Sequence, residues 1–286
     1  MMRRSVVGAA STRVAGWQKR GIKLPGVKDI IAVASGKGGV GKSTVSTNLA
    51  LAISALGKRV ALLDADVFGP SIPRMLNLSE QKPQVTDTQQ LLPLSNYGIK
   101  CMSMGFLAEK DSPMIWRGPM VMGALEQLLR AVAWNNNGDV DVMVIDLPPG
   151  TGDTQLTLTQ RVQLTGAVIV STPQDIALED ARRGANMFRK VEVPILGLVE
   201  NMSYFACPKC GEGARQTAKE MGMDFLGEVP LHMTIRETSD SGRPVVVSQP
   251  SSPQAEAFKH IARQVLDKIQ DPAFRKDQEA PRIIYS

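Results

Sequence analysis

The chain has 286 residues, of which 43% are hydrophobic and 21% charged, a globular composition that excludes a mainly disordered or fibrous protein. Its apolar runs are shorter than the roughly 18–20 residues that a membrane-spanning helix needs, so no stable membrane insertion is expected. Its three cysteines are too few for a disulfide framework, which favours a reducing compartment.

The chain opens with a basic leader. Residues 1–28 contain seven basic side chains and no acid, and the remaining 26 basic and 28 acidic residues leave the rest of the chain with a balance of −2. The leader is typical of a mitochondrial transit peptide, with a disordered basic tail as the alternative, and we assign residues 1–25 to it. Because the rest of the chain is near neutral, its bulk charge does not support a nucleic-acid-binding face.

After the leader, apolar runs alternate with helical patterns. This alternation predicts an α/β fold, a doubly wound and mostly parallel sheet with helices on both faces. We expect one domain over 26–270, with a polar surface segment at 79–96 and a loose tail at 271–286. The expected strands are 30–35, 59–64, 98–104, 140–146, 166–172 and 194–200. The expected helices are 42–55, 119–133, 175–190, 213–221 and 253–270.

A glycine-rich phosphate-binding pattern, G-x-x-x-x-G-K-S, lies between the first expected strand and helix. Its glycines allow the backbone to wrap around phosphate oxygens, where the amides meet the positive end of the helix dipole. Lys42 would reach the β and γ phosphates of ATP, and Ser43 would ligate Mg²⁺. The predicted nucleotide-binding residues are Gly36, Gly38, Gly39, Val40, Gly41, Lys42, Ser43 and Thr44.

Acidic residues end two of the expected strands. Asp64 and Asp66 follow the second strand, and Asp146 ends a later one. Carboxyl ends of parallel strands lie at the same edge of the sheet as the phosphate loop. We therefore expect Asp146 to hold Mg²⁺ directly or through water, Asp66 to orient or activate the attacking water, and Asp64 to support Asp66 within the magnesium site. The amide of Gly150, in the next loop, could sense the γ phosphate.

Cys207 and Cys210 are spaced as half of a metal site. Two thiolates can hold one ion or one edge of a cluster, but they cannot complete a four-thiolate shell. Cys101 lies in an expected strand and is interpreted as a buried apolar residue. A symmetric dimer would supply four sulfurs from two pairs. The spacing alone leaves Zn²⁺, a 4Fe–4S cluster and a redox dithiol open.

The phosphate-binding segment Lys37-Gly-Gly-Val-Gly-Lys-Ser-Thr44 resembles the deviant P-loop of the superclass that contains MinD, ParA and the nitrogenase iron protein. That resemblance implies that Lys37 reaches across a homodimer to the partner's nucleotide, as an arginine finger does. It also implies that Asn201 binds the edge of the adenine base, for which an amide has both a donor and an acceptor.

Longer motifs extend the resemblance to roughly residues 26–270. Asp64-Ala-Asp-Val-Phe-Gly-Pro-Ser-Ile-Pro73, Asp146-Leu-Pro-Pro-Gly-Thr-Gly-Asp153 and Asn201-Met-Ser-Tyr-Phe-Ala-Cys-Pro-Lys-Cys210 resemble the Mrp/ApbC family of iron–sulfur carrier P-loop ATPases. The chain departs from that family after Cys210, where only Gly211 and Glu212 precede the next helix; relatives usually have a longer stretch there.

The family resemblance implies an ATP-dependent scaffold or carrier for a 4Fe–4S cluster, with weak ATPase activity. Cys207 and Cys210 would be the cluster ligands, shared across a homodimer. With its leader, the chain is similar to the mitochondrial members, which implies a matrix location and delivery of clusters to apo-proteins of respiratory complex I. The alternatives are a MinD/ParA-like positioning ATPase and a zinc-stabilised nucleotide-binding protein without a cluster.

Overall fold

The computed structural model describes residues 21–67, 69–107, 118–150, 152–203 and 213–279. Within these residues an eight-stranded sheet has the strand order β3-β4-β2-β5-β1-β6-β7-β8. The strands are β1 (Val27–Ser35), β2 (Val60–Asp64), β3 (Leu94–Asn96), β4 (Ile99–Ser103), β5 (Val140–Asp146), β6 (Gly166–Ser171), β7 (Ile195–Asn201) and β8 (Phe225–Val229). All neighbouring pairs are parallel except β3 and β4.

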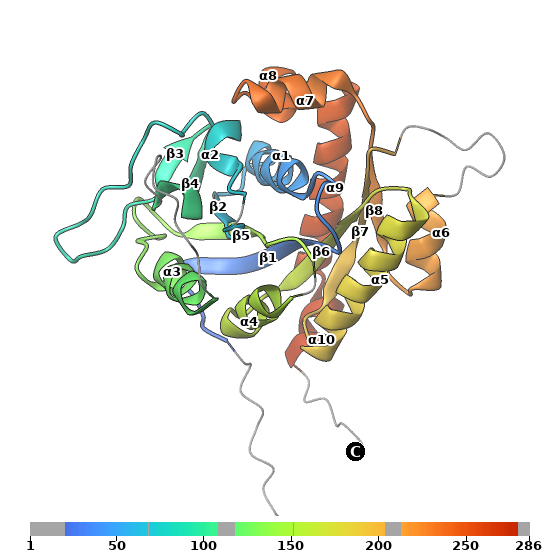
Figure 1. Ribbon diagram of the computed structural model, residues 1–286, viewed down its shortest axis with the longest axis horizontal. Coiled ribbons are helices and arrows are strands. Elements are labelled where there is room, and N and C mark those ends of the chain that lie inside the picture. Colours follow the sequence, from blue (N-terminus) through green and yellow to red (C-terminus); the bar gives the residue numbers. More distant parts are fainter. Residues whose placement is uncertain (1–20, 68, 108–117, 151, 204–212, 280–286) are drawn as a thin grey trace, which may run out of the picture.

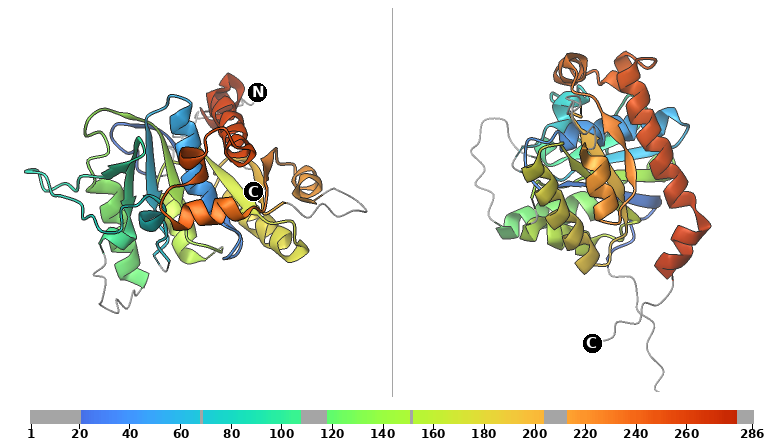
Figure 2. Two further views of the ribbon diagram at one scale, coloured as in Figure 1. Left: turned by 90° about the horizontal axis from the view of Figure 1, so that it is seen from above. Right: turned by 90° about the vertical axis from the view of Figure 1, so that its right-hand side faces the viewer.

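Helices cover both faces of the sheet (Figure 1). They are α1 (Lys42–Ala55), α2 (Ile72–Met75), α3 (Gly118–Arg130), α4 (Asp153–Arg161), α5 (Asp175–Lys190), α6 (Gly213–Glu220), α7 (Met233–Asp240), α8 (Val245–Ser248), α9 (Pro253–Gln270) and α10 (Pro272–Glu279). Helices α1 and α9 pack together on one face, and α3, α4 and α5 lie on the other (Figures 1 and 2). This arrangement confirms the predicted α/β fold.

The central strands are buried on both faces. Strand β2 is buried throughout, and β1 is buried at every position except Lys28. Such continuous apolar runs are the pattern of parallel strands covered by helices on both sides, which is why the sequence predicted them. Because these strands are parallel, the carboxyl ends of β1, β2, β5, β6 and β7 lie at one edge of the sheet.

Several elements were not predicted, and their sequences explain why. Helix α4 has Leu156 and Leu158 two residues apart, a spacing that favours a strand over a helix. Strand β8 is five residues long and has Gly227 in its middle, which weakens the strand signal. The polar segment 79–96 is mostly exposed, as expected, but it ends in the edge strand β3.

The fold begins before the predicted domain start at residue 26. The backbone N–H of Ile22 donates to the oxygen of Arg161 at 2.7 Å, and the N–H of Gln163 donates to the oxygen of Ile22 at 3.1 Å. The side chain of Leu24 is 1% exposed. Residues 22–24 therefore belong to the folded domain, although the sequence placed them in the leader.

The expected loose tail at 271–286 is wrong for residues 272–279, which form α10. The helix starts with Pro272 at a position where its missing N–H is not needed, and the side chain of Asp271 accepts from the N–H of Ala273 at 2.8 Å. Arg275 then pairs with Asp29 of β1 at 3.0 Å, and Phe274 packs against the core. These contacts fix α10 to the start of the central strand.

Candidate functional site

The phosphate-binding pattern forms the loop between β1 and α1. Gly39 and Gly41 have φ values of +81° and +78°, the left-handed region that favours glycine. A Cβ at Gly38 or Gly39 would meet no atom within 4 Å, whereas a Cβ at Gly41 would lie 2.2 Å from Nδ2 of Asn201. The loop therefore borders open space at Gly38 and Gly39 and is closely packed at Gly41. We call this open part of the loop the cradle.

Three side chains of α1 converge on the carboxylate of Asp146 at the end of β5. The hydroxyl of Ser43 donates to Oδ2 at 2.6 Å, and Nζ of Lys42 lies 2.8 Å from Oδ1. The hydroxyl of Ser46 also donates to Oδ1, at 2.6 Å. Asp146 is fully buried. The serine and the acid that were predicted to share Mg²⁺ are therefore in direct contact.

Ser46 was missed by the sequence analysis. It lies three residues after Ser43, a spacing that places both hydroxyls on the same face of a helix. That spacing was the available signal, but it does not by itself identify Asp146 as the acceptor.

Asp64 is fully buried at the end of β2, beside the same site. Ser103 donates its hydroxyl proton to Oδ2 at 2.9 Å, and the backbone N–H groups of Asp66 and Ile72 donate to the carboxylate at 3.2 and 3.3 Å. Burial first, and the charge of Asp146 second, raise the pKa of Asp64 to about 7. Through the two backbone hydrogen bonds, Asp64 holds the segment that follows β2 in place. Its role at the metal stays a prediction.

Asp66 lies on that segment and faces the phosphate-binding lysine. Its Oδ2 is 3.9 Å from Nζ of Lys42. Because Lys42 is the residue expected to bind the β and γ phosphates, this distance is compatible with the predicted role of Asp66 toward the attacking water, which stays a prediction.

Three other predicted residues lie in the loop or against it. Asn201, at the end of β7, donates from Nδ2 to the oxygen of Val40 at 2.8 Å, and its contact with the adenine base stays a prediction. Lys37 is partly exposed, and its backbone oxygen accepts from the hydroxyl of Ser35 at 2.9 Å. The N–H of Gly150 donates to the oxygen of Ser35 at 3.0 Å, which joins the predicted γ-phosphate loop to the end of β1.

The remaining nucleotide residue, Thr44, lies in the first turn of α1, and its backbone oxygen accepts from the side chain of Asn48 at 3.0 Å. That bond ties the first turn to the next one.

The predicted cluster ligands Cys207 and Cys210 lie outside the described residues. The chain before them leaves the carboxyl end of β7, where Ser203 donates its N–H to the oxygen of Val229 at 3.0 Å. The described chain resumes at Gly213, the start of α6. Cys101 is fully buried, as expected, and burial raises the pKa of its thiol.

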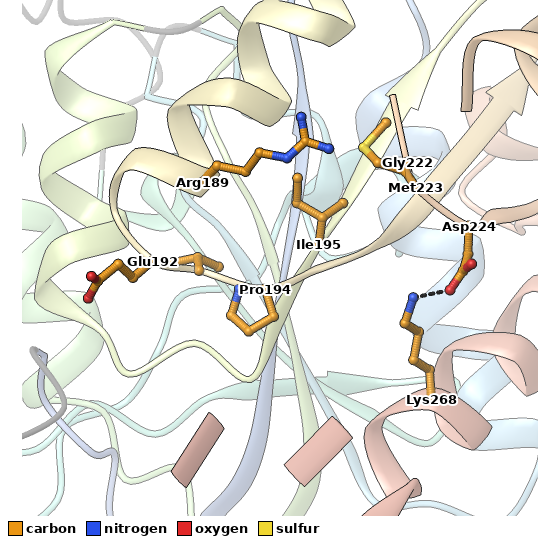
Figure 3. Close-up of a pocket in the computed structure, with 9 residues that line it drawn as sticks. Arg189, Glu192, Pro194, Ile195, Gly222, Met223, Asp224 and Lys268 are labelled. Atoms are coloured by element: carbon orange, nitrogen blue, oxygen red, sulfur yellow. Dashed lines mark hydrogen bonds and ion pairs between the residues drawn. The ribbon is translucent and has the colours of Figure 1, made fainter. Parts of the chain in front are cut away.

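A cavity of about 300 Å³ lies elsewhere, beside the amino ends of β7 and β8 (Figure 3). Figure 3 shows Lys268 paired with Asp224, and Lys268 also donates to the oxygen of Leu196 at 2.9 Å. Arg189 donates to the oxygen of Met221. Because these cations already have partners within the protein, the cavity is a weaker candidate for a ligand site than the phosphate-binding loop.

Comparison with known proteins identifies the family. Residues 26–266 match the sequence model of the ParA-type group described as NUBPL iron-transfer P-loop NTPase. The chain belongs to this family. It is 58% identical over 274 residues to the iron-sulfur cluster transfer protein NUBPL of Dictyostelium discoideum, an alignment that covers 92% of this chain and 84% of the relative.

A plant protein and a solved archaeal structure are also similar to this chain. The Arabidopsis thaliana protein named as an iron-sulfur protein required for NADH dehydrogenase, mitochondrial, is 53% identical over 94% of this chain and 88% of its own length. The solved structure of a nucleotide-binding protein from Archaeoglobus fulgidus in complex with ADP matches with a TM-score of 0.67 and 40% identity, over 82% of this chain and 92% of that chain.

MinD of Aquifex aeolicus has a TM-score of 0.64 at 20% identity, over 83% of this chain and 97% of its own, which confirms the MinD/ParA-like fold. None of the helices in the described residues is both long and apolar enough to span a membrane.

Proposed function

We propose that this protein is an ATP-dependent carrier of 4Fe–4S clusters. Its membership of an iron-transfer family of P-loop NTPases and the names of its relatives support a role in cluster transfer. The observation that carries the nucleotide-dependent part is the contact between Ser43 and Asp146, 2.6 Å apart, next to Lys42. Ser43 and Asp146 would provide oxygen ligands for magnesium, and Lys42 would provide the cation for the phosphates of the nucleotide.

The residues present fit magnesium only together with a nucleotide. Among the described residues, no group of three or more His, Cys, Asp or Glu side chains could hold a metal ion by itself. Mg²⁺ commonly binds through one or two protein oxygens together with phosphate oxygens and water. Ser43 and Asp146 would supply the protein oxygens, and the bound ion would neutralise phosphate charge.

The loop's own residues then account for a slow ATPase. The amides of residues 38–44 bind phosphate, Lys42 turns from Asp146 to the β and γ phosphates, and Asp66 orients the attacking water. Lys37 of one copy adds a cation to the nucleotide of the other. Asn201 lies beside the loop and would contact the base.

A homodimer would form at the carboxyl edge of the sheet. Exposed apolar side chains lie on segments that follow the ends of β6 and β8: Ile176 is 69% exposed, Leu231 58% and Met233 63%. Apolar side chains on the edge that carries the phosphate loop are suited to contact a second copy. The described chain that precedes Cys207 and Cys210 ends with Ser203, at this edge too, so closing the dimer around ATP would change how exposed the cluster is.

The cluster is the cargo of this protein. Cys207 and Cys210 of each copy would hold it, so that two copies supply four thiolates. The name of the Arabidopsis relative supports a mitochondrial location, and delivery in the matrix to apo-proteins of respiratory complex I is the finer proposal. The acid-free leader is compatible with import.

Anaerobic reconstitution with iron and sulfide tests the cargo. The unchanged chain should elute as a brown dimer with one 4Fe–4S cluster, and a Cys207→Ser, Cys210→Ser double variant should stay colourless. Cys101→Ala is the matched control, since it removes a buried thiol that lies in the core. Colour that persists in the double variant would contradict the ligand assignment.

The same preparation separates the alternatives. Zinc in place of iron, in protein purified without oxygen, would favour the zinc-stabilised alternative. Binding to liposomes or DNA that depends on ATP would favour a positioning ATPase.

A further inference from the structure

The side chain of Ser46 points at the magnesium-binding end of the site. Its Oγ is 2.6 Å from Oδ1 of Asp146, and both residues are 0% exposed. The phosphate-binding pattern ends before Ser46 and does not require a hydroxyl there. Its contact with Asp146 therefore needs a separate explanation.

The hydroxyl of Ser46 has one proton and two acceptors within reach. One acceptor is the backbone oxygen of Lys42, at 3.0 Å, and the other is the carboxylate of Asp146, at 2.6 Å. Hydrogen bonds to ionised acceptors are shorter and roughly twice as strong as neutral ones. We therefore assign the proton of Ser46 to the bond with Asp146.

Among the described residues, Lys42, Ser43 and Ser46 contact this carboxylate with their side chains, and of these three only Ser46 has no other task when a magnesium nucleotide binds. Lys42 is expected to turn to the phosphates, and Ser43 to the metal. Both would then leave or weaken their bonds to Asp146. Ser46 would remain bonded to Oδ1 and would leave Oδ2, now contacted by Ser43, facing the metal position.

From this geometry we propose that Ser46 is a positioning residue of the magnesium site. It holds the carboxylate of Asp146 in one orientation through this hydrogen bond, and it acts through Asp146 without touching the nucleotide. The proposal rests on the nucleotide-dependent function proposed above. It implies that loss of the Ser46 hydroxyl weakens the binding of Mg²⁺ to the nucleotide complex, but leaves nucleotide binding in the absence of Mg²⁺ unchanged.

Titration of MgCl₂ into the full chain holding a fluorescent, non-hydrolysable ATP analogue tests this. Ser46→Ala should raise the magnesium midpoint about tenfold, since the lost hydrogen bond is to a charged group. Its affinity for the analogue in EDTA should match that of the unchanged chain. Ser46→Thr keeps the hydroxyl and should restore the midpoint to within about threefold.

Thr47→Val is the matched control. Thr47 is the next residue of α1 and is also fully buried, but its hydroxyl contacts the sulfur of Met75 at 3.7 Å instead of Asp146. This variant should leave the magnesium midpoint unchanged. If Ser46→Ala does not fold, Ser46→Cys replaces it, because a thiol of similar shape is a weak donor and should raise the midpoint in the same direction.

Two results would overturn the proposal. One is a Ser46→Ala midpoint equal to that of the unchanged chain. The other is an equal loss of affinity with and without Mg²⁺, since that pattern shows a general structural role. Failure of the unchanged chain to bind the analogue would refute the proposed function and this inference with it, and it is recognised because it occurs without any substitution.

Discussion

Lys42 and Asp146 form a buried ion pair, with Nζ 2.8 Å from Oδ1, where the phosphate-binding loop meets the end of β5. Lys42 is 5% exposed and Asp146 is 0% exposed. A second carboxylate, that of Asp66, lies 3.9 Å from the same ammonium. One lysine therefore balances the negative charge of two acids that the magnesium nucleotide would also approach.

The first prediction concerns the stability of this pair. Lys42→Met should lower the free energy of unfolding by about 3 kcal/mol, because it leaves the buried charge of Asp146 without its ammonium partner. Adding Asp146→Asn to that variant should restore most of the loss, since the fully buried carboxylate that lay 2.8 Å from the lost ammonium is then replaced by a neutral amide. Urea unfolding of the two single variants and the double variant measures the coupling. Single losses that simply add in the double variant would contradict the prediction.

The second prediction concerns pH. Folding raises the pKa of Asp64 from 3.8 to about 7, so between these values the folded state binds more protons than the unfolded state. The contribution of Asp64 is therefore fully present in acid and is lost as the pH rises through about 7. Stability of the unchanged chain should fall as the pH rises from about 4 to about 7, the interval between the two pKa values of Asp64.

Asp64→Asn is the control, because an amide does not titrate in this range. Its unfolding free energy, measured with urea at each pH, should depend less on pH than that of the unchanged chain. Equal slopes for both proteins would show that Asp64 is not the titrating group.

The third prediction separates two glycines of the phosphate loop. Gly41→Ala should cost about 2 kcal/mol of stability, because it combines a left-handed φ with a Cβ that would lie 2.2 Å from Nδ2 of Asn201. Gly38→Ala should change stability by less than about 0.5 kcal/mol, since its Cβ would meet open space. It should nevertheless weaken ATP binding, because phosphate oxygens need that space. Thermal unfolding and nucleotide titration measure the two effects, and a destabilised Gly38→Ala with normal ATP affinity would count against the cradle.

The fourth prediction concerns α10. Arg275→Ala should destabilise the protein by about 1–2 kcal/mol, because Asp29 is 4% exposed and loses its charged hydrogen-bond partner. The neighbouring Lys276 is exposed and is the matched control; Lys276→Ala should stay within about 0.5 kcal/mol. Urea unfolding compares them. Equal effects would indicate that α10 contributes nothing specific through the Asp29 pair.

The phosphate-binding loop was predictable because its determinants are close together in the chain. Gly39 and Gly41 permit positive φ values, and Lys42 and Ser43 open the helix that follows. The position of Asp146 was predictable for a related reason. An acid at the end of a buried parallel strand must lie at the edge where the loop lies, whatever the exact packing.

The tertiary structure decided which residues that are far apart in the chain contact each other. Ser46 and Asp146 are 100 positions apart, and Asp29 and Arg275 are 246 apart. No local pattern in the sequence encodes such a pair. This is why Ser46 was missed and why residues 272–279 were expected to be loose.

The sequence by itself determined the sheet, the phosphate loop and the edge at which the acids gather, because apolar periodicity and glycine spacing act over a few neighbouring residues. Only the tertiary structure decided which hydroxyls serve Asp146 and how strongly Asp64 holds a proton. The physical reason is that hydrogen-bond partners and desolvation depend on which strands and helices surround a group, and β2 buries Asp64 only once it lies between β4 and β5.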